Sequence, residues 1–480
     1  MMHLGRSRSG LHLGKCKPDY LPFCLQPIPT YLFLQCRLHC SRTAIPSQGL
    51  WCSHDPDPPP PCPCCCVRSP PITPKAPKAP VTAVSTLSNG LRVVSTESGQ
   101  AVSGFTLRVG SGTRDESSKQ AGASLLLRNL AFQSTEQRSA LKLNRDLEDA
   151  GALLSSAAGR EDVTYCVEAL PQAAELAVQA LAETTLQPLL RPWNVADTLA
   201  KVNSVDLADH AKNTETLLCD AVHGAAFGDG SPMGHSLYSS CKLTADGLSE
   251  YMSSQYTAPN MVLSASGISH TSLVALAEEA FAAASSSKKV AAAGAGGYFG
   301  GEAHVSTDAA STHVVLAFQG LAATDKDLAS FEVLKALLDI KVKSVASDSA
   351  AFGVNYSDTG LLGVRGCAAN DDAEALTSAL QGALKSTLKS PPTANELAAA
   401  LSAASVGCHQ ALLCPKGASG ALATSVALRG SPDLPSFEPS AITAASVQAV
   451  AKRVLSTPLS VAVVGDVSAV PRCATLAKGF

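Results

Sequence analysis

The sequence contains little charge for its length. Only 16% of its 480 residues are Asp, Glu, Lys or Arg, whereas 46% are hydrophobic. A chain with this composition must remove much of its apolar surface from water, either in a core or in an interface. We therefore expect a soluble body with a large core and a buried contact with a partner.

Two further absences exclude classes of function. No uninterrupted apolar run reaches the roughly 18 residues that suggest a membrane-spanning helix, because prolines and glutamines interrupt the best candidate, residues 20–36. Basic residues are not in excess either, since 37 Lys and Arg stand against 40 Asp and Glu. The sequence thus predicts no transmembrane helix and no nucleic-acid partner.

Motifs of common catalytic sites are also missing. No H-x-x-E-H or H-E-x-x-H pattern is present, and neither is a G-x-S-x-G elbow or a Walker A loop. The glycines between 294 and 301 follow no predicted strand and miss the third glycine of G-x-G-x-x-G, which favours a linker. Cys408, His409 and Cys414 are close in sequence, but their spacing matches no compact zinc site. We expect them to be ordinary helix positions.

Acidic residues are frequent between positions 115 and 162, without a recognisable catalytic pair. We expect most of them to be loop charges and helix caps. They are Asp115, Glu116, Asp146, Glu148, Asp149, Glu161 and Asp162.

Charge, proline and cysteine are unevenly distributed. Residues 1–80 hold nine Lys and Arg against three Asp and no Glu, together with nine of the 16 Cys and 16 of the 29 Pro. A basic, acid-poor N-terminal stretch is typical of an organelle-import segment, although prolines this dense prevent a long amphipathic helix. We expect residues 1–80 to be a targeting or disordered leader. The seven Cys of the remaining body form no C-x-x-C pair, which indicates a reducing compartment.

From Thr82 onward, strand and helix patterns alternate. A hairpin is predicted around Asn89-Gly90, and a small-residue stretch at 286–302 is predicted to be a flexible linker. Other strands are predicted at 101–112, 152–159, 162–170, 261–267, 312–320, 357–368 and 459–466. Helices are predicted at 121–132, 142–150, 171–186, 193–227, 248–256, 272–284, 327–338, 372–388, 394–413 and 447–454.

The two parts on either side of the linker end in similar segments. QYTAPNMVLSASGIS and VLSTPLSVAVVGDVS both pass from a helix end through proline and a strand to a glycine, Gly267 or Gly465. A repeat of about 200 residues indicates duplicated domains. We predict an α+β fold of two homologous sandwich halves, 82–285 and 303–480. Each half is expected to be a mainly antiparallel sheet covered on one side by helices.

Several segments resemble the pitrilysin-type zinc metallopeptidases. They are LSNGLRV, VGSGTRDE, GASLLLRNLAFQST, LEDAGALLSSAAGREDVTYCVEAL and the final VVGD. This superfamily includes the mitochondrial processing peptidase and the core proteins of respiratory complex III, and its members are built of two related α+β halves joined by a linker. The resemblance covers residues 82–480 and implies the same architecture here.

The resemblance also implies a degenerate active site. Active members carry H-F-L-E-H in the segment that corresponds to Gly122–Thr135, with two zinc-binding His and a Glu that activates water. Leu125, Arg128 and Asn129 occupy the first His, the Glu and the second His positions. The third ligand, a Glu, falls at or near Asp206. One carboxylate cannot complete a three-ligand zinc site, so we expect no catalytic residue, no metal and no cofactor.

Among the inactive branches, core protein 2 of complex III has the most similar segments, which are LRPWNVADTLAKVNS, MVLSASGISH, YFGGE and AFGVNYSDTGLLGV. The α branch of the processing peptidase also lacks the zinc ligands. It carries a long glycine-rich substrate loop in its second half, whereas the corresponding residues here, Leu337–Ala351, include no glycine. We therefore expect the core-protein branch.

That branch implies a non-catalytic structural subunit of ubiquinol–cytochrome c reductase, which supports electron transport from ubiquinol to cytochrome c. The expected partners are core protein 1 or a processing-peptidase β-like subunit, cytochrome b and cytochrome c1, in a dimeric complex. The expected location is peripheral, on the matrix side of the mitochondrial inner membrane. The alternative is the non-catalytic, substrate-recognising α subunit of the processing peptidase. An active peptidase with a displaced site is a third hypothesis, and it predicts bound zinc.

Overall fold

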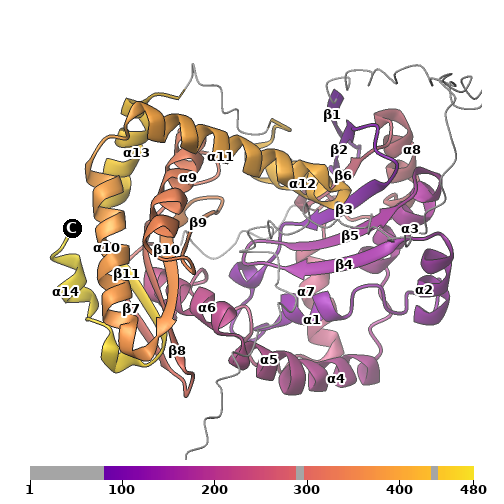
Figure 1. The fold of residues 1–480 in the computed structure, drawn as a ribbon. Helices are drawn as coiled ribbons and strands as arrows, with labels where there is room; N and C mark the ends of the chain where they lie inside the picture. The colour runs from indigo at the N-terminus through magenta and orange to yellow at the C-terminus, as the bar shows by residue number, and fades with distance from the viewer. Residues whose placement is uncertain (1–80, 288–296, 434–441) are drawn as a thin grey trace, which may run out of the picture. The chain divides into compact units, whose positions relative to one another are not determined.

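The structure is a computed structural model that describes residues 81–287, 297–433 and 442–480. The leader predicted over residues 1–80 lies outside these ranges, and so does most of the linker predicted over 286–302. Residues Pro80–Phe480 form one unit, which contains two β-sheets with their helices (Figure 1).

The first sheet has six strands in the order β1-β2-β6-β3-β5-β4. Its neighbours are antiparallel except for the parallel pair β2 and β6. The predicted hairpin around Asn89-Gly90 is confirmed, because Gly90 adopts a positive φ of 93° between β1 and β2. The strands are Val81–Thr86 (β1), Arg92–Glu97 (β2), Ser103–Val109 (β3), Leu153–Ala158 (β4), Val163–Ala169 (β5) and Met261–Ser266 (β6).

The second sheet has five strands in the order β7-β11-β8-β10-β9, of which only β7 and β11 are parallel. The strands β2-β6-β3-β5-β4 of the first sheet repeat this order and these directions. The predicted pair of homologous α+β halves is therefore confirmed. The second set comprises Gly301–Ser306 (β7), Ser311–Gln319 (β8), Ala350–Asn355 (β9), Gly360–Ala369 (β10) and Ser460–Gly465 (β11).

Helices connect the strands in both halves. In the first half they are Ala123–Asn129 (α1), Ala140–Asp149 (α2), Ala174–Leu186 (α3), Pro192–Lys201 (α4), Leu207–Lys212 (α5), Thr214–Phe227 (α6), Ala245–Gln255 (α7) and His270–Ala280 (α8). In the second half they are Leu328–Val345 (α9), Ala373–Lys389 (α10), Ala394–Leu413 (α11), Pro415–Arg429 (α12), Ala444–Leu455 (α13) and Cys473–Ala477 (α14). Short 3-10 turns occupy Thr113–Asp115, Pro171–Ala173, Ala258–Asn260, Asn370–Asp372 and Val467–Ala469.

The long helical region predicted over 193–227 is interrupted twice. A π-helical turn, Val202–Asp206, separates α4 from α5. Asn213 then ends α5 and caps α6, because its side-chain oxygen accepts hydrogen bonds from the backbone amides of Glu215 and Thr216. This cap changes the direction of the chain at a point where the hydrophobic pattern alone predicts one continuous helix.

Each sheet buries apolar side chains on the face toward its own helices. In β3, Phe105, Leu107 and Val109 alternate into the first core, and in β8, Val314, Leu316 and Phe318 alternate into the second. This is the period-two pattern of a sheet with one face against helices. Full burial stabilises each such side chain by roughly 1.5–3 kcal/mol.

The opposite face of the first sheet is covered by α12, a helix from the second half (Figure 1). Thr106, whose side chain alternates with the core residues, lies 2.7 Å from Ser419 on α12 (Oγ1 to Oγ). Val426 of α12 joins the apolar cluster formed by Val94 and Val262 on this face. The expectation of helices on one side only is therefore incomplete.

The exchange is reciprocal, since α6 of the first half packs on β7, β8 and β11 of the second sheet. Arg365 of β10 reaches back to Glu215 of α6, with 2.8 Å between Nη1 and Oε1. Each half therefore completes its layers with a helix from the other half.

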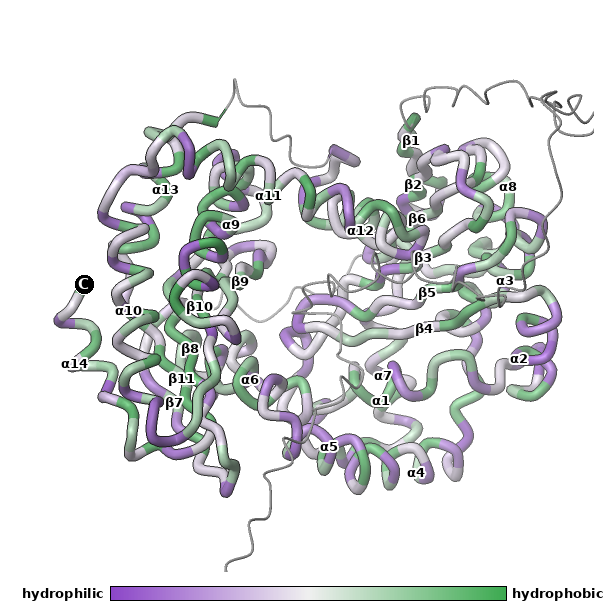
Figure 2. Tube along the Cα trace, viewed as in Figure 1, coloured by the Kyte–Doolittle hydropathy of each residue, from purple (hydrophilic) through white to green (hydrophobic). Residues whose placement is uncertain are grey.

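Helix α12 and strands β7 and β9 were not predicted. The sequence GEAHVS of β7 has few β-branched residues, and it is held in place by its parallel pairing with β11. Figure 2 shows that α12 mixes hydrophobic and hydrophilic residues, whereas α2 is predominantly hydrophilic. In the part of the chain that the structure describes, no single helix is long and apolar enough to cross a membrane. The pair α11 and α12 meets the criteria of length and composition only jointly, with a bend of 110° between them.

Candidate functional site

Helix α1 carries three of the four positions at which the resemblance places the lost catalytic groups. The helix starts after Gly122, which adopts a positive φ of 84°. The Glu116 carboxylate caps this end, accepting hydrogen bonds of 2.7 Å from the amides of Gly122 and Ser124. Burial raises the pKa of Glu116. The expectation that acidic residues here serve as caps is confirmed for Glu116.

Leu125 belongs to the core rather than to an accessible site. Its side chain is 2% exposed and packs in the first hydrophobic cluster. Its backbone carbonyl accepts a hydrogen bond of 3.0 Å from the side-chain amide of Asn129, one helical turn later. An apolar side chain at this position offers no ligand atom.

Arg128, Asn129 and Asp206 come together, although 77 residues separate Asn129 from Asp206. The Asn129 amide donates a hydrogen bond of 2.9 Å to Oδ2 of Asp206. Nη2 of Arg128 lies 3.5 Å from the same oxygen. Asp206 ends the π-helical turn between α4 and α5, and π-turns inside helices are frequent at functional sites.

The charges of this site are balanced internally. Arg128 and Asp206 retain 24% and 15% side-chain exposure, so the pair is only partly shielded from water. Both neighbours of the carboxylate are hydrogen-bond donors, and one of them is a cation. The geometry ties α1 to the α4–α5 segment, and the two groups that contact the Asp206 carboxylate here are a guanidinium and an amide, neither of which is a general base.

These residues do not fit a catalytic zinc ion. A single carboxylate, a guanidinium and an amide lack the three ligands that such a site uses, and the positive charge of Arg128 opposes a dication beside Asp206. Among residues 81–287, 297–433 and 442–480, no group of three His, Cys, Asp or Glu could hold a metal ion.

Further polar side chains adjoin the site, and the sequence did not indicate them. Tyr238, in the loop after α6, stacks on His210 of α5 with 4.2 Å between ring centroids. Burial raises the pKa of Tyr238, and the nearby Arg128 opposes the rise. His210 in turn lies 3.4 Å from Asp220 (Nε2 to Oδ2), which pairs with the buried Arg160 at 2.8 Å. These loop and helix residues are far apart in sequence and form no motif, so the sequence alone could not group them.

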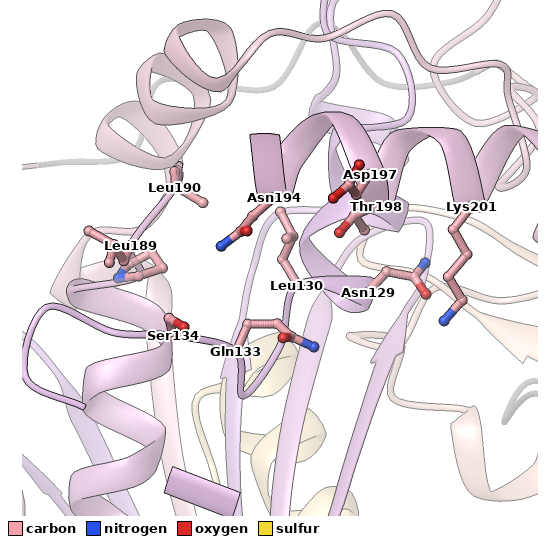
Figure 3. A pocket seen from close by; sticks show the side chains of 11 residues that line it. Asn129, Leu130, Gln133, Ser134, Leu189, Leu190, Asn194, Asp197, Thr198 and Lys201 are labelled. Atoms are coloured by element: carbon pink, nitrogen blue, oxygen red, sulfur yellow. The ribbon is translucent and has the colours of Figure 1, made fainter. Parts of the chain in front are cut away.

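A small cavity of about 260 Å³ opens beside Asn129. Figure 3 shows side chains of α4 along one side of it and residues that follow α1 along the other. The cavity is lined by three side-chain amides, by Lys201 and by several apolar side chains. The amides belong to Asn129, Gln133 and Asn194. Such a mixture suits hydrogen bonding to a polar chain segment rather than burial of an apolar ligand.

Of the three residues considered as remote metal ligands, Cys408 and His409 lie on α11 as expected, whereas Cys414 lies between α11 and α12. His409 is exposed on α11 and contacts the carbonyl of Ser405 at 2.6 Å through Nδ1. Cys408 is half-buried and Cys414 exposed.

Comparison with known proteins identifies the family. The insulinase model of peptidase family M16 matches residues 92–239, and the M16 inactive-domain model matches residues 242–404. The chain is 30% identical over 331 residues to the α subunit of the mitochondrial-processing peptidase of Solanum tuberosum, a match that covers 63% of this chain and 65% of that protein.

Two complex III subunits are similar at nearly the same level. Cytochrome b-c1 complex subunit 2 of Mus musculus is 28% identical over 299 residues, covering 58% of this chain and 65% of that protein. Cytochrome b-c1 complex subunit 1 of Bos taurus is 28% identical over 316 residues, covering 59% and 65%. The chain thus spans just under two thirds of the length of these relatives.

These identities correct one expectation. Core protein 2 is not specifically favoured, because the processing-peptidase α subunit and both complex III subunits match at 28–30%. Since the two family models match successive parts of the body, the chain belongs to the M16 peptidase family, and its second matched region is the inactive domain of that family.

Proposed function

We propose that this chain is a non-catalytic M16 subunit that acts within a larger mitochondrial assembly. The observation that carries the proposal is the state of Asp206, whose carboxylate is held by Arg128 and Asn129 where active members bind zinc. The mitochondrial assembly is inferred from the relatives, which are subunits of the mitochondrial-processing peptidase and of the cytochrome b-c1 complex.

The first role is that of a structural core subunit of complex III, placed peripherally on the matrix side of the inner membrane. Its partners there would be core protein 1, cytochrome b and cytochrome c1. One feature of the second half supports this role over the α subunit. Residues 337–351, where the α branch has its glycine-rich loop, here form the end of α9 and a four-residue connection to β9.

Copurification tests this role. Complex III is isolated from mitochondria by its ubiquinol–cytochrome c reductase activity, and its subunits are quantified by mass spectrometry. The proposal expects this chain in constant ratio to cytochrome b through every fraction. Its absence from active complex III rules out the core-subunit role.

The second role is the substrate-recognising α subunit of a processing peptidase. The potato relative and the amide-lined cavity beside Asn129 favour it. The purified chain is mixed with a zinc-bearing β-type subunit, and cleavage of a presequence peptide is followed. This role is supported if the wild-type chain restores cleavage and the Asn194→Leu variant does not. The absence of cleavage with a competent partner excludes this role.

A further inference from the structure

Two equivalent hairpin turns, one from each half, meet in the structure. Residues 159–162 join β4 to β5, and residues 356–359 join β9 to β10. Both turns have four residues, and in both the first amide donates to the fourth carbonyl, at 2.7 Å from Gly159 and 2.8 Å from Tyr356. Because β4-β5 and β9-β10 hold the same places in their sheets, the turns are copies of one element.

A single guanidinium joins the two turns. Arg114 donates from Nη1 to Glu161 at 2.6 Å. It also binds Asp358 in a bidentate way, with distances of 2.9 and 2.5 Å. Glu161 and Asp358 are each the third residue of their turn, so one cation bridges two equivalent carboxylates.

Backbone contacts between the turns reinforce this bridge. The amide of Ser357 donates to Glu161 at 2.9 Å, and its hydroxyl donates to the same carboxylate at 2.6 Å. The side chains of Arg114 and Glu161 are 9% and 11% exposed, whereas Asp358 is 31% exposed. The hydrogen bonds that Arg114 donates to Asp358 raise the pKa of Arg114, with Glu161 contributing. Water therefore screens Glu161 weakly and Asp358 more, and Arg114 supplies the compensating charge for both.

Polar contacts are prominent elsewhere between the halves as well. On the α12 face of the first sheet, the Arg108 guanidinium reaches the carbonyl of Thr424, and the Arg92 guanidinium reaches that of Val426. The apolar cluster on this face is small. Two halves with separate cores and a partly polar interface can move relative to each other, unless specific contacts prevent it.

We propose that Arg114 is a lock that fixes the two halves in one relative orientation by bridging Glu161 and Asp358. With the guanidinium in place, the turns form a closed junction. Without it, the largely buried Glu161 carboxylate and the partly exposed Asp358 carboxylate lack a shared cation, and the junction opens at the turns. This conformational device is independent of whether the chain serves complex III or a processing peptidase.

Hydrogen exchange of the full-length chain, read by mass spectrometry, tests the lock. Arg114→Met is compared with Arg138→Met, which removes an ion pair of similar burial within the first half. The lock predicts at least tenfold faster exchange of the amides in both turns in Arg114→Met. It predicts no change there in Arg138→Met. Equal exchange in Arg114→Met and wild type, or equal acceleration in the two variants, overturns the proposal.

A triple variant separates charge from packing. Arg114→Met combined with Glu161→Gln and Asp358→Asn removes the repulsion, so exchange at the turns should return toward the wild-type rate. Exchange as fast as in Arg114→Met alone contradicts the charge bridge. If Arg114→Met does not fold, the single variant Asp358→Asn replaces it in the test. This variant leaves the Arg114–Glu161 pair intact, so amide exchange should accelerate in the 356–359 turn but not in the 159–162 turn. Unchanged exchange in the 356–359 turn contradicts the lock.

Discussion

The side-chain amide of Asn129 and the carboxylate of Asp206 are joined by a hydrogen bond of 2.9 Å. The resemblance places two zinc ligands of active members at the Asn129 position and at or near Asp206, and these two residues are in contact here. The second N–H of Asn129 donates to Leu125, which lies on the same helix face. If the correspondence holds, α1 and the π-helical turn can bring a ligand pair together once the side chains are changed.

Reinstating the side chains is expected to reinstate metal binding. Leu125→His, Arg128→Glu, Asn129→His and Asp206→Glu together supply two imidazoles at i and i+4 and a carboxylate from the π-helical turn. After dialysis, elemental analysis should find about one zinc per chain in the variant and none in the wild-type protein. The same variant with Ala at position 206 is the control and should bind zinc much more weakly. Zinc in the wild-type protein would instead support a displaced active site.

Two of the arginine–carboxylate pairs of the first half, Arg128–Asp206 and Arg138–Glu183, should differ in their effect on stability. Arg128 is 3.5 Å from Asp206 and partly exposed, so Arg128→Met should cost at most about 1 kcal/mol in the free energy of unfolding. Arg138→Met leaves Glu183 unpaired at 8% exposure and should cost roughly 3–5 kcal/mol. Urea unfolding monitored by circular dichroism measures both. A larger loss for Arg128→Met would mean that its pair with Asp206 is structurally central.

Local elements were predictable from the sequence because local patterns determine them. Asn89-Gly90 specified the first hairpin, and the matching ends at Gly267 and Gly465 indicated duplication, which the common strand order confirms. The resemblance alone assigned Leu125, Arg128 and Asn129, by counting along the segment that holds H-F-L-E-H in active members. It also placed the third ligand at or near Asp206, and the structure shows Asp206 in contact with Asn129.

Long-range relationships could not be predicted in the same way. The exchange of α6 and α12 between the halves depends on which sheet face is left open, and no periodicity within a helix reports that. The π-helical turn at Val202–Asp206 has no sequence signature distinct from an ordinary helix. The bridge from Arg114 to Asp358 spans 244 positions, so its residues look like unrelated loop charges until the turns are seen together.

The close approach of α12 to the first sheet depends on Gly104. A Cβ at this position would lie 2.4 Å from the carbonyl oxygen of Pro415, which is backbone and cannot rotate away. Gly104→Ala should therefore displace α12 and cost about 1–3 kcal/mol in the free energy of unfolding. Gly420→Ala, on α12 itself, meets nothing within 4 Å and should be neutral or stabilising by up to about 1 kcal/mol. Thermal unfolding of both variants measures the two changes in stability. Equal changes in Gly104→Ala and Gly420→Ala would contradict the close packing of α12 on Gly104.

His223 should make stability fall in mildly acidic solution. It is fully buried on α6, where Nε2 lies 2.7 Å from the hydroxyl of Tyr356, and burial lowers its pKa well below the ordinary 6.5. As pH falls below 6.5, the unfolded chain binds a proton that the folded chain does not. Stability is then lost at up to about 1.4 kcal/mol per pH unit.

His223→Gln should remove this part of the pH dependence, measured as unfolding free energy between pH 7 and 5. Tyr356→Phe deletes the hydroxyl but leaves the imidazole buried, so it should weaken the fold while keeping the slope. A slope unchanged in His223→Gln would assign the acid sensitivity to other groups.

Glu116 should show the opposite dependence on pH. Burial raises its pKa above the ordinary 4.5, so the folded chain keeps this proton at pH values where the unfolded chain has lost it. The resulting stability is complete below pH 4.5 and declines as pH rises through the raised value. Glu116→Gln cannot ionise and also loses one of the two acceptor oxygens that cap α1. The stability difference between wild type and Glu116→Gln should therefore be largest at about pH 4 and smaller at pH 7. An advantage of the wild type that grows with pH would show that the two capping hydrogen bonds outweigh burial.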